Sequence, residues 1–249
     1  MRGSPGFSEV VPVPVRGTGY ENGVLSRVTG GQLRPGGVDL TERMLTLADL
    51  PAQAHILDLG CGTGSTVDSL LEVGFRAVGL DRSELLLQTG KMSAPSLPVL
   101  CGWSKSLPLV SGQFDAILAE CSLSTMSDLD AVLAECWRVL RPGGRLSVSD
   151  LYVRNPEGLP ALRALPFSCG MREALTQAEL TAQLRAHGFE IVAWEDHSET
   201  LKTIAAQMIL AHGSLNEFWS KSEPQANPFD LQIAISRAKL GYFVLVAQR

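Results

Sequence analysis

Along most of the chain, apolar residues are spaced in one of two ways, which follow each other in turn. Short apolar runs are each followed by stretches in which apolar residues recur at spacings of three and four, as in amphipathic helices. The strand-like runs are 55–60, 76–81, 97–103, 114–122, 145–153, 189–196 and 241–248, and the helix-like stretches are 38–50, 65–74, 83–92, 128–140 and 176–188. This alternation predicts an α/β fold, built as a doubly wound and mostly parallel sheet of seven strands.

Two segments depart from the alternation. Residues 1–37 are rich in Gly, Pro and Val and predict an irregular arm, whereas 38–249 form one domain. An insertion at about 198–238 lies before the last strand; within it, we predict helices over 199–213 and 230–241 and a loop over 214–229. Insertions at this edge of a sheet commonly shape a substrate lid or a partner surface.

The composition of the chain argues against nucleic-acid, metal and membrane partners. The chain has 249 residues and a net charge of −5, and its Lys and Arg residues are scattered, so we expect no nucleic-acid partner. Five cysteines without CxxC spacing argue against a disulfide framework and a metal site, and favour a cytoplasmic protein. No apolar run approaches the length of a membrane span, so we expect no membrane association. The oligomeric state is left open.

The stretch "ILDLGCGTG" ends the first strand and opens the first helix. Asp58 precedes Gly60, Gly62 and Gly64, where side chains would keep the backbone away from a ligand and φ can be positive. The spacing is GxGxG after an acidic residue, not the GxGxxG that cradles a pyrophosphate. Asp58 would repel a diphosphate and attract a cation. S-adenosylmethionine (SAM) is such a ligand, although a nicotinamide or flavin site stays open at this point.

A second acidic residue follows the second strand. Asp81 lies where, in doubly wound folds, a carboxylate accepts hydrogen bonds from the ribose hydroxyls of a nucleotide. Together with the glycine turn, it favours an adenosyl cofactor.

Four motifs then support a family assignment. Over roughly residues 38–195 the chain resembles the class I SAM-dependent methyltransferases, of the methyltransferase type 11 or UbiE-like kind, through "ILDLGCGTG", "AVGLDRS", "SLPLVSGQFDAILAECSLSTMSD" and "ECWRVLRPGGRLSVSD". The resemblance implies a Rossmann-like sheet with an antiparallel last strand and SAM as cofactor. It implies a cofactor site of Asp58, Gly60, Cys61, Gly62, Gly64, Asp81, Arg82, Trp103, Ser104 and Glu120.

One position departs from the family pattern. Where the family usually has an aspartate that accepts a hydrogen bond from adenine, this chain has Trp103. An indole can only donate, so we expect Trp103 to stack on the base and the Ser104 amide to bond it, with ordinary packing of Trp103 as the alternative.

The reaction that the resemblance implies is an in-line transfer of the activated methyl group to a small-molecule acceptor. Positioning supplies most of the catalysis, and a base is needed only if the acceptor arrives protonated. The sequence assigns no catalytic residue; Glu120 and His197 are weak candidates at strand ends.

For the acceptor, we expect contacts from Cys121, from Cys169 and from Tyr20 in the N-terminal arm. The stretch around Cys169 is similar to the metalloid-binding segment of arsenite methyltransferases, which makes metalloid methylation one alternative. A non-catalytic protein that binds SAM as a sensor or accessory is the other.

Overall fold

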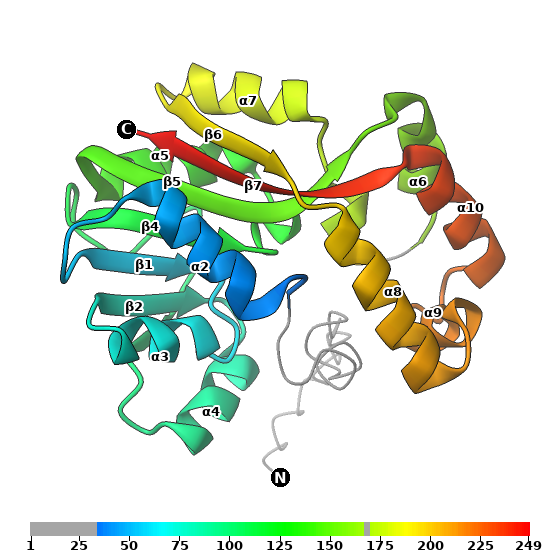
Figure 1. The fold of residues 1–249 in the computed structure, drawn as a ribbon, viewed down its shortest axis with the longest axis horizontal. Coiled ribbons are helices and arrows are strands. Elements are labelled where there is room, and N and C mark those ends of the chain that lie inside the picture. Colours follow the sequence, from blue (N-terminus) through cyan, green and yellow to red (C-terminus); the bar gives the residue numbers. More distant parts are fainter. Residues whose placement is uncertain (1–33, 167–169) are drawn as a thin grey trace, which may run out of the picture.

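The computed structural model describes residues 34–166 and 170–249. Within them, one sheet has the strand order β3-β2-β1-β4-β5-β7-β6 (Figure 1). Its strands are β1 (His55–Leu59), β2 (Arg76–Asp81), β3 (Val99–Cys101), β4 (Phe114–Glu120), β5 (Leu140–Val153), β6 (Glu190–Asp196) and β7 (Leu240–Gln248). Strand β7 runs antiparallel to both neighbours, and the pairs among β1 to β5 are parallel. The predicted α/β sheet is confirmed.

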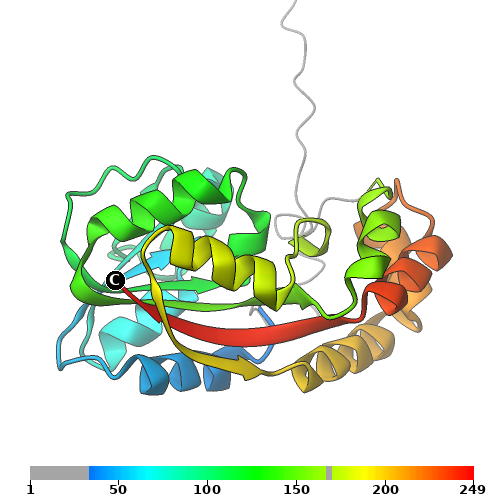
Figure 2. The ribbon, with the colours of Figure 1, turned by 90° about the horizontal axis from the view of Figure 1, so that it is seen from above.

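Helices cover both faces of this sheet (Figure 2). One face carries α2 (Gly37–Ala48), α3 (Ser65–Glu72) and α4 (Glu84–Ser93). The other carries α5 (Leu129–Val139) and α7 (Gln177–Ala186). Successive residues of β7 alternate between the two cores: Tyr242 and Val244 join the first, and Phe243 and Leu245 the second. Burial on both faces explains why the strands are apolar almost throughout.

The strand order reverses between β1 and β4, which both end at the same edge. In open α/β sheets, ligands bind outside the carboxyl ends of the strands at such a reversal. The turn after β1 and the residues that end β2 and β4 therefore lie where this fold binds its ligands.

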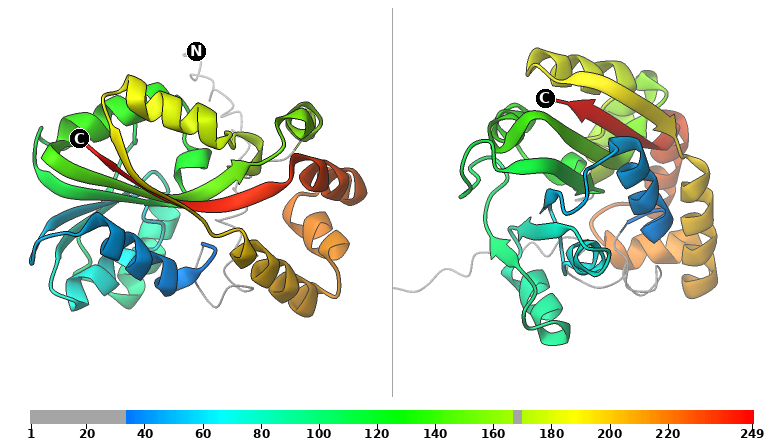
Figure 3. Two further views of the ribbon diagram at one scale, coloured as in Figure 1. Left: turned by 45° about the horizontal axis from the view of Figure 1, so that its top comes forward. Right: turned by 60° about the vertical axis from the view of Figure 1, so that its left-hand side comes forward.

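The insertion folds into three helices rather than two (Figures 1 and 3). They are α8 (Glu199–His212), α9 (Leu215–Ser222) and α10 (Pro228–Ala238), packed near η2 (Pro156–Gly158) and α6 (Leu159–Arg163). The loop predicted over 214–229 was wrong where α9 lies. Ser214 caps this helix by accepting the Glu217 amide, and Phe218 is buried against α8. Helix α9 has too few apolar residues to show a helical periodicity in the sequence.

The predicted arm of residues 1–37 mostly lies outside the described residues. Helix α2 begins at Gly37, one residue before the predicted start, and Arg34 to Gly36 lead into it.

Helix α4 approaches the glycine turn very closely at Gly90. A Cβ atom there would lie 1.9 Å from the Thr63 carbonyl oxygen, and backbone cannot move away as a side chain can.

We expect Gly90→Ala to lower the free energy of unfolding by about 2 kcal/mol. Overpacking against backbone costs about 3 kcal/mol, and the better helix propensity of Ala returns about 1 kcal/mol. Urea unfolding measures the change. Thr89→Ala, at an exposed position of the same helix, is the control and should stay within about 0.5 kcal/mol of the parent; equal losses in both variants would refute the steric explanation.

Candidate functional site

The turn after β1 has the backbone that its glycines predicted. Gly60, Gly62 and Gly64 have φ values of 84°, 55° and 80°. The amides of Gly60 and Cys61 both donate to the Leu80 carbonyl, at 2.7 and 3.1 Å, which ties the turn to β2. A Cβ on Gly60 would lie 2.5 Å from that of Ser122, so glycine is needed there for space as well as for its positive φ.

Asp81, at the end of β2, holds this turn in place. Its Oδ2 accepts the Gly62 amide at 2.8 Å, and its Oδ1 accepts the Ser83 amide at 2.8 Å. The sequence predicted a ribose-binding role but not this bond to the glycine turn. A carboxylate has about four acceptor positions, so both oxygens keep capacity for a further donor.

Glu120, at the end of β4, is the most heavily bonded carboxylate at this edge. Thr41 Oγ1 of α2 lies 3.1 and 3.0 Å from its two oxygens, and Thr66 Oγ1 of α3 donates to Oε1 at 3.4 Å. Arg34 forms an ion pair with Oε2 and also donates to Thr41 Oγ1 at 2.9 Å. Elements from three parts of the chain therefore meet on one buried side chain.

Asp58 lies close to this group and is almost fully buried. Burial raises the pKa of its carboxyl well above the ordinary value, and the Glu120 carboxylate raises it further; Arg34 lowers it, and Asp81 raises it again. The pKa of Glu120 is also raised by burial, against the opposing effects of Arg34, Thr41 and Thr66. Asp58 and Glu120 share the guanidinium of Arg34, so ionisation of both carboxyl groups would leave a negative charge in excess, which a bound cation would offset.

Arg34, Thr41 and Thr66 were not predicted from the sequence. Nothing in the local pattern marks Arg34, which precedes a proline at the start of α2. A buried partner for Glu120 could have been expected, because an unpaired buried carboxylate is costly. The sequence does not indicate which residue supplies that partner.

The residues predicted to lie near adenine follow β2 and β3. Trp103 is 56% exposed, so it is not a core residue, and its backbone pairs with Ser106 in a short turn that contains Ser104. Arg82 is exposed. The thiol of Cys61 is buried against Gly79 of β2, and burial raises its pKa, so the side chain is neutral packing inside the turn.

The residues predicted to contact the acceptor are not brought together within the described residues. Cys169 and Tyr20 lie outside them. Cys121 is buried on the α2 face with φ of 52°, and its amide donates to the Ser149 carbonyl at 2.6 Å. Positive φ is rare for a non-glycine residue and is held here by the surrounding contacts.

His197, the other weak catalytic candidate, lies in a cluster formed by α2 and β6. Its Nε2 is 3.0 Å from Glu195 Oε2, and Arg43 forms an ion pair with the same carboxylate. The hydrogen bond from Arg43 is the main reason that the pKa of Glu195 is lowered to about 2. The hydrogen bonds of this histidine therefore join it to a partly exposed ion-pair cluster, not to Glu120.

The described residues offer neither a metal-ligand cluster nor a membrane-spanning helix. No three His, Cys, Asp or Glu side chains of residues 34–166 and 170–249 converge as metal ligands would. In the same ranges, no helix is both long and apolar enough to cross a bilayer.

Comparisons with known proteins agree with this geometry. Residues 57–148 match the family model described as a methyltransferase domain. The demethylmenaquinone methyltransferase of Streptomyces avermitilis is 31% identical over 169 residues, which are 59% of this chain and 72% of that protein.

Solved structures show the same fold. The [4+2]-cyclase SpnF has a TM-score of 0.71 at 25% identity and covers 95% of this chain and 98% of its own. Phosphoethanolamine N-methyltransferase 2 of Haemonchus contortus, in complex with S-adenosyl-L-methionine, has a TM-score of 0.69 at 16% identity, over 95% of this chain and 58% of that one.

The fold and these comparisons thus define a SAM-dependent enzyme of the Rossmann-like class. The chain belongs to the class I SAM-dependent methyltransferases, as the sequence motifs indicated. Its cofactor is S-adenosylmethionine, and its activity is methyl transfer.

The buried ion pair gives a prediction on stability. Arg34→Met leaves the Glu120 carboxylate buried without its cation and should cost about 3 kcal/mol of unfolding free energy at pH 8. Because loss of Arg34 raises the pKa of Glu120 further, the folded protein takes up a proton there as the pH falls, and the deficit should shrink at lower pH. Urea unfolding at several pH values measures both effects.

Adding Glu120→Gln to Arg34→Met is the matched control. The double variant carries no buried charge at this position and should recover most of the loss, without the pH dependence. A double variant as unstable as the single one would contradict the assignment to an unpaired carboxylate.

Proposed function

We propose that this methyltransferase binds the amino-acid end of SAM at the cluster of Asp58, Glu120 and Arg34. The observation that carries the proposal is the pair of buried carboxyl groups of Asp58 and Glu120, at the ends of β1 and β4, with the single guanidinium of Arg34 beside them. SAM carries a sulfonium, an ammonium and a carboxylate. Glu120 and Asp58 complement the two cations, and Arg34 complements the carboxylate.

The remaining cofactor contacts follow along the same edge. The amides of the turn from Gly60 to Gly64 lie against the ligand, and Asp81 accepts from the ribose hydroxyls with its unused acceptor positions. Trp103, which is 56% exposed, stacks on adenine, and Ser104 and Arg82 border the base.

When bound, the cofactor supplies an activated methyl group. The protein positions that group and keeps water out, which can contribute about 7–11 kcal/mol in favourable cases. Glu120 is occupied by Thr41, Thr66 and Arg34, so in this proposal it binds and orients rather than removing a proton. His197 has no role in it.

The acceptor is a small molecule. A relative named for demethylmenaquinone supports this class of acceptor without identifying the one used here. No observation favours a non-catalytic sensor, a nicotinamide or flavin enzyme, or a metalloid methyltransferase. The absence of a nucleic-acid partner and a cytoplasmic location stay predictions from composition.

Isothermal titration with SAM and with S-adenosylhomocysteine tests the cofactor site. We expect both to bind, and Asp81→Ala to weaken SAM binding by about 1.5–3 kcal/mol through loss of hydrogen bonds to a charged acceptor. Asp81→Asn keeps one acceptor oxygen and should lose less. An unchanged affinity in a folded Asp81→Ala variant would remove the ribose assignment, and no binding of either ligand to the parent would remove the proposed site.

Cofactor binding should also release protons. A bound cation favours the ionised forms of Asp58 and Glu120, whose pKa values are raised in the free protein. SAM affinity should therefore increase as the pH rises through those values and then level off.

Titration in two buffers of different ionisation enthalpy measures the number of protons released, over about pH 5 to 8. Asp58→Asn removes one titrating group and should reduce the release. Proton uptake on binding, or an affinity independent of pH, is the opposite of what the carboxylate cluster requires.

A further inference from the structure

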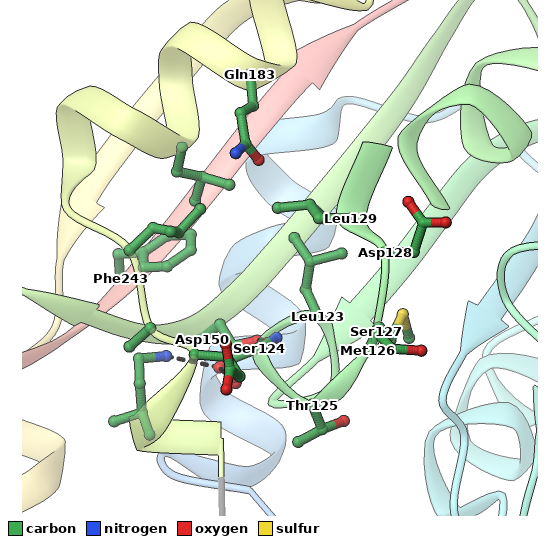
Figure 4. Close-up of a pocket in the computed structure, with 15 residues that line it drawn as sticks. Leu123, Ser124, Thr125, Met126, Ser127, Asp128, Leu129, Asp150, Gln183 and Phe243 are labelled. Atoms are coloured by element: carbon green, nitrogen blue, oxygen red, sulfur yellow. Dashed lines mark hydrogen bonds between the residues drawn. The ribbon is translucent and has the colours of Figure 1, made fainter. Parts of the chain in front are cut away.

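A cavity of about 510 Å³ lies behind the segment that follows β4, on the face of the sheet covered by α5 and α7 (Figure 4). The 3-10 helix η1 (Leu123–Thr125) forms one wall and α7 another, with Phe243 of β7 at the side. Glu120 bonds to α2 and α3 on the other face. The cavity is therefore separate from the carboxylate cluster, and its volume is that of a pocket for a small organic molecule.

The lining combines apolar walls with negative charge. Leucine side chains, Met126 and Phe243 supply the apolar surface, and Asp128, Asp150 and Glu173 supply the carboxylates. Among the described residues that line the cavity there is no Lys, Arg or His. Glu173 pairs with Arg172, which lies outside the lining, at 3.9 Å. An anionic ligand would therefore meet mainly the carboxylates of Asp128 and Asp150, whereas a neutral or cationic ligand would not be repelled.

One buried polar atom beside this cavity has no hydrogen-bond partner. Gln183 Oε1 is buried and accepts no hydrogen bond. Figure 4 shows the Gln183 side chain extending from α7 toward the space between η1 and Phe243. A buried acceptor without a donor is costly, and a ligand that donates a hydrogen bond to it, after a rotation of the Gln183 amide toward the cavity, would remove that cost.

Asp150 stabilises the wall rather than offering a free base. Its Oδ2 accepts the Ser124 amide at 2.8 Å, and its Oδ1 accepts the Ser124 hydroxyl and the Leu151 amide, both at 2.7 Å. With these donors in place, η1 is fixed to β5. The cavity is thus a formed space, bounded by regular elements on several sides.

The same segment touches the glycine turn. Ser122 Oγ donates to the Leu59 carbonyl at 2.7 Å, and the Met126 methyl lies 3.4 Å from where a Cβ on Gly60 would be. The cavity and the turn are therefore neighbours with one shared wall.

We infer that this cavity is a second small-molecule site, distinct from the cofactor turn, for an apolar molecule that carries no negative charge and donates a hydrogen bond to Gln183. A suitable probe is 2-(1-naphthyl)ethylamine, which has a flat apolar body and an ammonium donor. Its matched control is 1-naphthylacetate, which has the same ring system and the opposite charge.

Titration of the protein saturated with S-adenosylhomocysteine tests the inference. We expect the amine to bind at least about tenfold more tightly than the acid, because the lining is anionic. Displacement of one ligand by the other would mean that the amine occupies the cofactor site, and would overturn the inference. Equal binding of amine and acid, or binding of neither, would overturn it as well.

Two variants locate the probe. Gln183→Leu removes the acceptor and should weaken amine binding about three- to tenfold. Ser127→Trp places a large side chain at an exposed rim position and should block entry without altering a core residue. Gln177→Leu, on the same helix but outside the lining, is the control and should bind the amine as the parent does.

The cofactor affinity of each variant is measured alongside. It should change by less than about twofold, since none of these positions contacts the carboxylate cluster. Full amine binding by both Gln183→Leu and Ser127→Trp would remove the cavity assignment, while leaving the proposed SAM site untouched. If the parent protein itself bound no SAM, that result would instead refute the proposed cofactor site.

Discussion

The burial of the Glu120 carboxylate is the constraint on which the rest of the site depends. A carboxylate at the end of a central strand can stay ionised only with donors and a cation around it. Thr41, Thr66 and Arg34 supply them from α2, α3 and the segment just before α2. Meeting this requirement brings the start of the described chain against the switch point of the sheet, and so closes the edge where the cofactor is proposed to bind.

The turn after β1 is likewise held by contacts from other parts of the chain. Its amides bond to Leu80 and Asp81 of β2, and Gly60 leaves room for Ser122 of the segment after β4. A turn with three positive φ values has little stability of its own. Contacts from β2, from the segment after β4 and from Gly90 of α4 hold it in place.

Much of this arrangement could be predicted from the sequence, because its signals are local. The apolar runs predicted the strands, the glycine spacing predicted the turn, and Asp81 could be assigned to a strand end. Arg34 could not, because its partner Glu120 is distant in sequence and no periodicity links them. Helix α9 was missed because Phe218 is its one buried residue, too little for a helical pattern to register.

The segment after β4 gives the site its two sides. Glu120, its last strand residue, bonds to helices on one face of the sheet, and Ser124, a few residues later, bonds to Asp150 on the other. The charge pattern differs accordingly: the first side pairs carboxylates with a guanidinium, and the second has carboxylates and apolar walls without a lining cation. A zwitterionic cofactor matches the first side and a non-anionic apolar molecule the second. One short segment therefore separates the two proposed sites by contacts to Leu59 on one side and to Asp150 on the other.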